Sequence, residues 1–155
     1  MTETALQRLK AAGWTSGRKV DITPIEEAYA DAEMEIPPKL REFFEEFGFL
    51  SIEYDIHRSE SRTEHESHWV DPRFDFHNYG KEDFEHLFDD YGVFGSAYPV
   101  GSAFRGNMTI YYHDDGNFYV YMACCGPLIR CGHSVESFLD GLLGDSDQDW
   151  EYLDE

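Results

Sequence analysis

Apolar residues recur at positions i, i+3, i+4 and i+7 in several stretches of the chain, the spacing of one face of an amphipathic helix. Thr4 with Gln7, and Thr23 with Glu26, have the spacing of a capping box at a helix start. Ser134 is a further candidate cap, at the start of the last apolar repeat. The pattern therefore predicts helices over residues 4–12, 23–32, 37–47, 84–91 and 134–143.

Alternation of apolar and polar residues predicts the strands. Residues 50–56 alternate strictly, which is typical of a half-buried strand. Asp-Asp-Gly-Asn at 114–117 predicts a hairpin turn, because Asp-Gly tolerates positive φ. The polar stretch 58–66 suggests a loop or hairpin tip. The other expected strands cover residues 68–70, 98–104, 108–113, 118–123 and 128–130.

Helices come first and strands fill the middle of the chain, with one helix between strands and one after them. This order favours an α+β fold, a single domain with a mostly antiparallel sheet packed against helices. We place the domain at residues 1–144. Residues 145–155 form an acidic C-terminal tail, which we expect to be mobile unless Trp150 and Tyr152 attach it to the domain or to a partner.

The charge narrows the possible partners. Lys and Arg number 12 against 32 Asp and Glu, a formal net charge of −20 at pH 7. Such a surface repels phosphate backbones and anionic lipids, so we expect no nucleic-acid or membrane partner. It attracts a basic protein and accelerates the encounter. Solubility, or life in high salt, is an alternative explanation of the same charge.

Cysteine content and hydropathy indicate a cytoplasmic protein. The three cysteines, Cys124, Cys125 and Cys131, are an odd number with one adjacent pair, which makes a poor disulfide framework. The N-terminal residues lack the apolar run of a secretory signal, and no stretch approaches 18 apolar residues.

No residue pattern predicts catalysis or cofactor binding. His65 and His68 are three residues apart and could bind zinc on a helix, with His57 upstream, but their segment lacks a helical period. The cysteines lack zinc-site spacing, and only His133 is near them in sequence as a base. Paired carboxylates such as Glu45-Glu46 favour solvated faces over acid–base chemistry. We expect no catalytic residue, metal, cofactor or small-molecule substrate.

Several motifs, in this order, resemble the third subfamily of the SUKH superfamily. The N-terminal part has Ala-Gly-Trp at 12–14 and Gly-Arg-Lys-Val-Asp at 17–21. The Pro-Pro helix then leads to Phe-Gly-Phe-Leu at 47–50, where Phe49 stands in place of a glycine usual in the family. The late hairpin has Pro-Val-Gly at 99–101, Tyr-His-Asp-Asp-Gly at 112–116 and Phe-Tyr-Val at 118–120. The resemblance covers residues 5–143, including the closing helix.

The resemblance implies an α+β domain that serves as an immunity protein in a bacterial polymorphic toxin system. Such proteins bind and block a cognate toxin domain, often a nuclease, without catalysis or cofactors. Alternatives are a general interaction module of the same fold and, less favoured, a metal-dependent or acid–base hydrolase. For the partner-binding surface we select acids of the fourth predicted helix and hairpin tyrosines: Glu82, Asp83, Glu85, Asp89, Asp90, Tyr111, Tyr119 and Tyr121.

Overall fold

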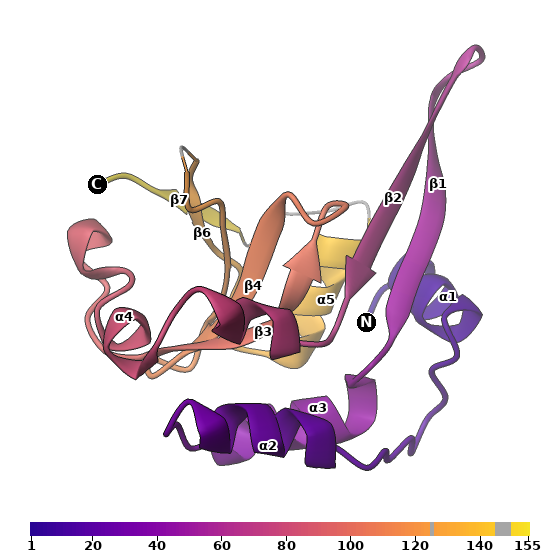
Figure 1. Cartoon of the computed structure of the whole chain (residues 1–155). Coiled ribbons are helices and arrows are strands. Elements are labelled where there is room, and N and C mark those ends of the chain that lie inside the picture. The colour runs from indigo at the N-terminus through magenta and orange to yellow at the C-terminus, as the bar shows by residue number, and fades with distance from the viewer. Residues whose placement is uncertain (125, 145–149) are drawn as a thin grey trace.

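The computed structural model describes residues 1–124, 126–144 and 150–155, and within them shows an antiparallel sheet packed against helices (Figure 1). This confirms the α+β expectation. Each strand pairs with the next along the chain, in the order β1 to β7. The helices are α1 (Glu3–Ala11), α2 (Thr23–Asp31), α3 (Pro38–Phe47), α4 (Lys81–Glu85) and α5 (Val135–Leu143), with 3₁₀ turns η1 (Arg73–His77) and η2 (Asp89–Tyr91). The strands are β1 (Ser51–Ser59), β2 (Arg62–Trp69), β3 (Ala97–Ala103), β4 (Met108–His113), β5 (Phe118–Tyr121), β6 (Leu128–Arg130) and β7 (Glu151–Leu153).

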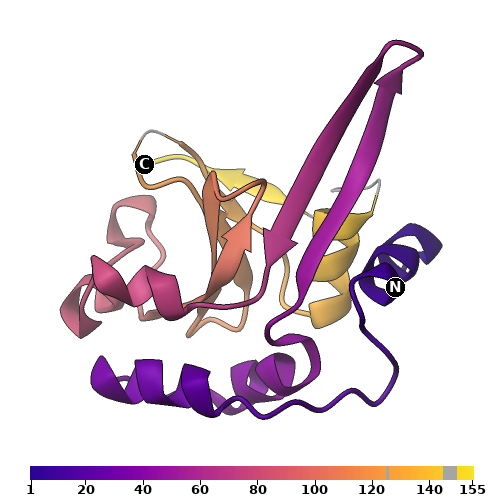
Figure 2. The ribbon, with the colours of Figure 1, turned by 45° about the vertical axis from the view of Figure 1, so that its right-hand side comes forward.

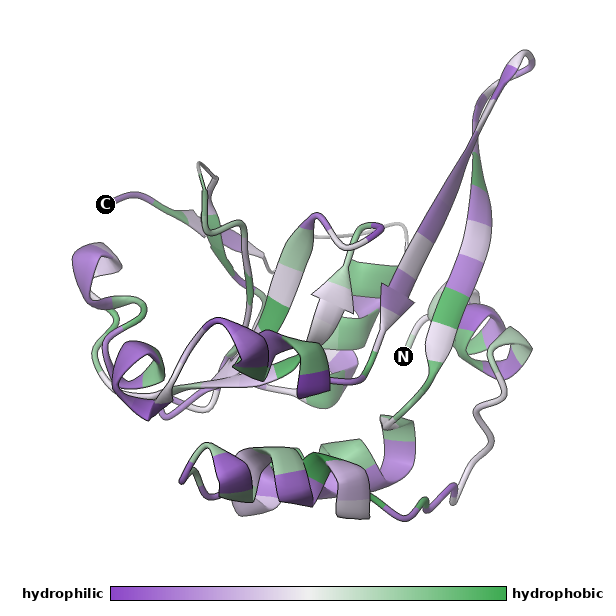
Figure 3. Ribbon diagram, in the orientation of Figure 1, coloured by the Kyte–Doolittle hydropathy of each residue, from purple (hydrophilic) through white to green (hydrophobic). Residues whose placement is uncertain are grey.

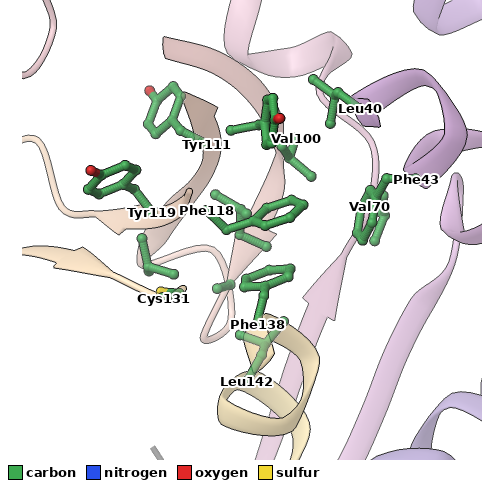
Figure 4. Packing of buried hydrophobic residues seen from close by; sticks show 14 of the residues in the cluster. Leu40, Phe43, Val70, Val100, Tyr111, Phe118, Tyr119, Cys131, Phe138 and Leu142 are labelled. Atoms are coloured by element: carbon green, nitrogen blue, oxygen red, sulfur yellow. The ribbon is translucent and has the colours of Figure 1, made fainter. Parts of the chain in front are cut away.

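Both faces of the central sheet are covered. On one face the ring of Phe118 stacks on Phe138 of α5, with 4.5 Å between ring centroids, and Phe43 of α3 packs beside them (Figure 4). On the other face Phe88, between α4 and η2, contacts Tyr111 and Tyr119. Because neither face meets water, β4 and β5 are almost continuously buried instead of alternating.

Two of the three expected helix caps differ from the sequence prediction. The hydroxyl of Thr2, not of Thr4, accepts from the amide of Ala5 at the start of α1. Before α2, the Asp21 carboxylate accepts from both the amide and the hydroxyl of Thr23, so the Thr23 hydroxyl serves as a donor and forms no capping box. Ser134 caps α5 as predicted. At the start of α2 the Asp21 carboxylate is a stronger acceptor for the exposed helix-end amide than the Thr23 hydroxyl, and it displaces that hydroxyl as the cap.

The predicted helix over residues 84–91 is wrong as a single element. α4 ends at Glu85, His86 leaves the helical region at φ −127°, and η2 follows. Phe84 and Phe88 are nonetheless both fully buried, as their spacing indicated. Tertiary packing of these two rings on the sheet outweighs continuous helical hydrogen bonding here.

The polar stretch at 58–66 contains a hairpin tip, one of the two alternatives that the sequence left open, and not a loop. β1 and β2 form a long hairpin, which we call the arm, and it projects from the domain (Figures 1 and 2). Trp69 with Ser102 is the one residue pair that joins β2 to β3. Towards the tip both faces of the arm are hydrophilic (Figure 3), so the apolar alternation that identifies a strand disappears there.

Phe49 is held in the left-handed region at φ 66°, at the position where the SUKH resemblance implies glycine. Its amide donates to the carbonyl of Val70 at 2.7 Å, which ties the end of α3 to the end of β2. Glycine adopts this conformation without steric cost, whereas a residue with a Cβ does not.

The described end of the tail is attached to the domain. β7 pairs with β6 over three residues, and the indole of Trp150 lies directly over Gly141 of α5. For residues 150–155 the alternative therefore holds that Trp150 attaches the tail to the domain. The expectation of a mobile tail does not apply to these residues. Residues 145–149 lie outside the described part, and the domain boundary at 144 remains a prediction. None of the helices in the described residues is long and apolar enough to span a membrane.

Candidate partner-binding surface

The five acids selected from the sequence lie close together on α4 and η2. Glu82, Asp83 and Asp90 are exposed, and Glu85 and Asp89 are half-buried. Asp83 accepts from the Gly80 amide at the start of α4, so part of its charge stabilises the helix end. Glu85 faces Lys81 at 3.9 Å, and Asp89 accepts from His86 at 2.9 Å. Glu82 and Asp90 make no ion pair within the described residues and are the acids best placed for a partner.

Tyr111 and Tyr119 cannot anchor a partner from the surface. They are 3% and 0% exposed, because the α4–η2 segment, through Phe88, covers the face of the sheet that carries them. Burial raises the pKa of both phenols, that of Tyr119 to about 12. The Tyr119 hydroxyl donates to Asp115 at 2.5 Å and accepts from Arg130. The structure therefore places both residues in the core, a position that alternation within a hairpin cannot indicate because it does not tell whether the second face is covered.

Tyr121 is half-exposed and lines a pocket of about 480 Å³ at the end of the sheet. Tyr91 of η2 and Tyr152 of β7 line the same pocket, together with Asp154 and Glu155. We call these five residues the tyrosine pocket. Figures 1 and 2 both show the C-terminal segment beside the turn that carries η2. No local sequence pattern indicates this pocket, because η2 and β7 are far apart in the chain and are brought together only by the fold of the sheet.

The rings of the tyrosine pocket are held by their neighbours. Tyr91 and Tyr121 meet edge to face with 5.9 Å between centroids, and Phe88 packs against Tyr121 from the core side. The Tyr91 hydroxyl donates to the carbonyl of Gly126 at 3.4 Å. Desolvation, the neighbouring Tyr121 and the carboxylate of Glu155 raise the pKa of Tyr91 to about 12. At neutral pH the pocket therefore presents neutral rings beside two carboxylates.

A second concave region, of about 510 Å³, lies between the arm and α5, with Tyr54, Phe104 and Leu142 among the residues that line it. The buried side chain of His68 forms hydrogen bonds with two residues that line this region, Tyr54 and Phe104. The Phe104 amide donates to Nδ1 of His68 at 3.1 Å, so Nδ1 is unprotonated and Nε2 donates to the Tyr54 hydroxyl at 2.7 Å. Tyr54 in turn donates to the carbonyl of Leu142. Desolvation, and then the charge of Arg8, lower the pKa of His68 to about 4.

The histidines considered as zinc ligands point apart. In a strand, residues three apart face opposite sides, and His65 is exposed while His68 is 1% exposed. His65 instead lies between the carboxylates of Asp55 and Glu53, at 3.0 and 3.3 Å, and these partners raise its pKa. Within the ranges that the structure describes, no three His, Cys, Asp or Glu side chains are placed to hold a metal ion.

Of the described cysteines, Cys131 is not available as a nucleophile. Cys131 is fully buried, and its burial raises the pKa of the thiol, which keeps it protonated. Cys124 is exposed, and Cys125 lies outside the described residues. His133 is exposed, at the start of the turn before α5. Cys131 is a core residue.

The basic side chains are largely neutralised. Counting described residues only, eight of the 12 lysines and arginines form ion pairs with carboxylates. Arg8 and Arg18 instead donate to main-chain carbonyls, those of Leu143, Glu46 and Gly48. The outward field of the molecule is thus set by the excess of acids.

The fold and this surface define an acidic α+β domain with partly exposed aromatic rings at one sheet end. Comparison with protein-family models identifies the SUKH-3 immunity protein family, whose model matches residues 1–145. The chain belongs to this family. Comparison with curated proteins gives no match, and neither does comparison with solved structures.

Proposed function

We propose that this protein is a cytoplasmic immunity protein that binds a cognate bacterial toxin domain and blocks it without catalysing a reaction. Membership of the SUKH-3 immunity protein family, over residues 1–145, is the observation that carries the proposal. The family implies a toxin as partner and does not require a catalytic site. The buried, protonated Cys131 thiol and the divergent His65 and His68 agree with a role in binding.

The proposed toxin is a basic protein, and a nuclease in particular. A nuclease must hold phosphate groups, so its active cleft tends to be positively charged. A protein of net charge −20 can occupy such a cleft as a mimic of phosphate. Long-range attraction also raises the association rate, which matters for an inhibitor that must intercept a toxin inside its own cell.

The acidic residues of α4 and η2 are the proposed contact surface. Glu82 and Asp90 are exposed on neighbouring turns, and Asp83, Glu85 and Asp89 lie between them. Charges at the rim of an interface contribute more to association rate and specificity than to final affinity. We therefore assign this segment the role of steering, beside a set of buried anchors that provide the affinity.

Co-expression with the toxin domain encoded by the neighbouring gene tests the function. We expect the wild-type protein to restore growth and to copurify with the toxin domain in a complex that weakens as salt rises. Reversal of two charges in Asp89→Lys/Asp90→Lys should slow association about tenfold at low salt and flatten its salt dependence. Reversal of Glu3 and Glu27, exposed acids on α1 and α2, is the control for net charge.

The outcomes separate the competing functions. Absence of both rescue and complex, with a folded protein, contradicts the immunity proposal and favours a general interaction module. Equal association rates for the Asp89/Asp90 and the Glu3/Glu27 variants would leave immunity in place and exclude the α4–η2 segment as the steering surface.

A further inference from the structure

Water reaches three aromatic rings in the tyrosine pocket. A surface that only keeps a protein in solution does not require accessible aromatic rings. Tyr152 is 62% exposed and is one of three large apolar side chains that are clearly exposed in the described residues. We propose that the tyrosine pocket binds one arginine side chain of the toxin. This inference rests on the proposed immunity function and specifies the chemistry of its partner.

The rings provide faces for a cation. The ring quadrupole of a tyrosine attracts a cation that lies over its face, and the attraction increases when the cation is desolvated. Tyr91 and Tyr121 contact each other edge to face, with 84° between their planes, so a cation reaches a ring face from the open side of the pocket and not from between the two rings. The volume of about 480 Å³ accepts a long side chain with its flanking main chain.

The carboxylates provide the charge complement. Asp154 and Glu155 line the pocket and are exposed, and neither forms an ion pair within the described residues. Among the residues that the structure describes, no lysine, arginine or histidine lines the pocket. A positively charged group is therefore the ligand that the lining favours, because an apolar side chain would desolvate the Asp154 carboxylate and leave Glu155 only its hydrogen bond with Tyr91.

The combination of flat rings and carboxylates favours arginine over lysine. The guanidinium group is planar, stacks on aromatic faces and donates in a fork that matches a carboxylate, and it is more weakly hydrated than an ammonium group. Arginine and tyrosine are also the residues most often found at the energetic centre of interfaces.

The pocket also adjoins the proposed steering surface. Tyr91 directly follows Asp90, so η2 contributes an acid to the α4–η2 segment and a ring to the pocket. A basic partner guided to α4 and η2 would reach the pocket without crossing another part of the molecule. Steering acids beside a desolvated anchor is the usual organisation of a specific interface.

The test compares Asp154→Asn/Glu155→Gln with a matched control, Glu27→Gln/Glu60→Gln, in binding kinetics with the neighbouring toxin domain. Both variants lose two exposed acids, so the change in net charge is equal. We expect the pocket variant to bind about tenfold more weakly, mainly through faster dissociation, and the control to change affinity less than about threefold. Tyr152→Leu keeps apolar area but removes a ring face, and should weaken binding about threefold or more.

A double-mutant cycle then identifies the bound side chain. Each toxin arginine and lysine is replaced by alanine, and one arginine substitution should weaken binding to the wild type about tenfold but cause little further loss with the pocket variant. Toxin binding that is equal for pocket and control variants, or coupling to a lysine, overturns the proposal while leaving immunity intact. Failure of the wild-type protein to bind or neutralise the toxin domain overturns the proposed function itself.

Discussion

At the scale of single residues, Phe49 shows a local cost that the fold imposes. Its φ of 66° is unfavourable for a residue with a Cβ, and its ring gains a contact with the guanidinium of Arg73, 5.4 Å from the ring centroid. The hydrogen bond from its amide to Val70 fixes this conformation. A glycine would satisfy the same backbone without strain, which explains physically why the family pattern has glycine here.

Phe49→Gly should therefore be more stable than Phe49→Ala, by about 1 kcal/mol in free energy of unfolding. Both variants lose the ring, but only alanine keeps the steric conflict. At ordinary loop positions alanine is the more stabilising residue, so the sign of the difference is diagnostic. Urea unfolding of the two variants gives the comparison, and an alanine variant that equals or exceeds the glycine variant would contradict the strain at this position.

His68 contributes a pH dependence to stability. Its pKa falls from an ordinary 6.5 to about 4 in the folded protein, so between these values the unfolded chain binds a proton that the native protein does not. Stability is fully present above pH 6.5 and is lost as pH falls towards 4, by about 3 kcal/mol. Nδ1 of His68 now accepts a hydrogen bond from the Phe104 amide, so its protonation would place two N–H groups against each other.

Asp75 opposes this effect and must be removed from the measurement. Desolvation raises its pKa to about 7, so its contribution is present below pH 3.8 and is lost as pH rises through 7. We therefore compare Asp75→Asn with Asp75→Asn/His68→Gln. Unfolding free energy of the first should fall by about 3 kcal/mol from pH 6.5 to 4 relative to the second. Parallel profiles would show that His68 remains protonated in the fold or titrates normally.

At the scale of elements, the arm and the C-terminal strand depend on very different contacts. The arm is held to the domain by the hydrogen bonds from the Phe104 amide to His68 and from the Tyr54 hydroxyl to the carbonyl of Leu142. Arg8 adds a contact, with its guanidinium 3.8 Å from the Tyr54 ring centroid. β7 is held by three residue pairs with β6 and by Trp150 on α5. A glycine inside a helix is unfavourable, so Gly141 indicates that close approach of the indole compensates for it.

Gly141→Ala should detach the C-terminal strand. A Cβ at this position would collide with the Trp150 indole, so we expect faster hydrogen exchange at residues 150–155 and a lower free energy of unfolding. In a Trp150→Ala background the same substitution should stabilise the protein by about 0.5–1 kcal/mol, because only helix propensity then changes. Equal effects in the two backgrounds would show that the indole does not occupy the space over Gly141.

At the scale of the whole molecule, the charge acts on stability as well as on binding. The ion pairs are mostly exposed, for example Arg58 with Glu64 at side-chain exposures of 55% and 32%, so each contributes little. The remaining acids repel one another in the compact state and less in the unfolded chain. The field proposed to attract a toxin therefore destabilises the isolated protein.

Added salt should consequently raise the melting temperature. Between 20 mM and 500 mM NaCl we expect an increase of about 3 °C for each kcal/mol of repulsion that is screened. Differential scanning fluorimetry with an equal osmolarity of sucrose as control separates screening from osmotic effects. A melting temperature that falls with NaCl would indicate that ion pairs outweigh repulsion in the fold.

Local pattern was sufficient for most elements. Apolar spacing predicted the buried residues of α2, α3 and α5, and the Asp-Gly turn predicted the β4–β5 hairpin, because these depend on neighbours within a few residues. It failed where burial is not the stabilising factor, as in the arm, whose outer residues are held by cross-strand pairs such as Arg58 with Glu64. It also failed where tertiary packing splits a helix, between Glu85 and Asp89.

The sequence by itself determined the fold class, the net charge and the family, since these follow from composition and from motifs in a fixed order. Only the tertiary structure decided which tyrosines face solvent. Tyr111 and Tyr119 are covered because α4 and η2 pack over their face, while Tyr91, Tyr121 and Tyr152 meet at the sheet end. The residues of this pocket are up to 64 positions apart in the chain, and no local pattern records that the sheet brings them together.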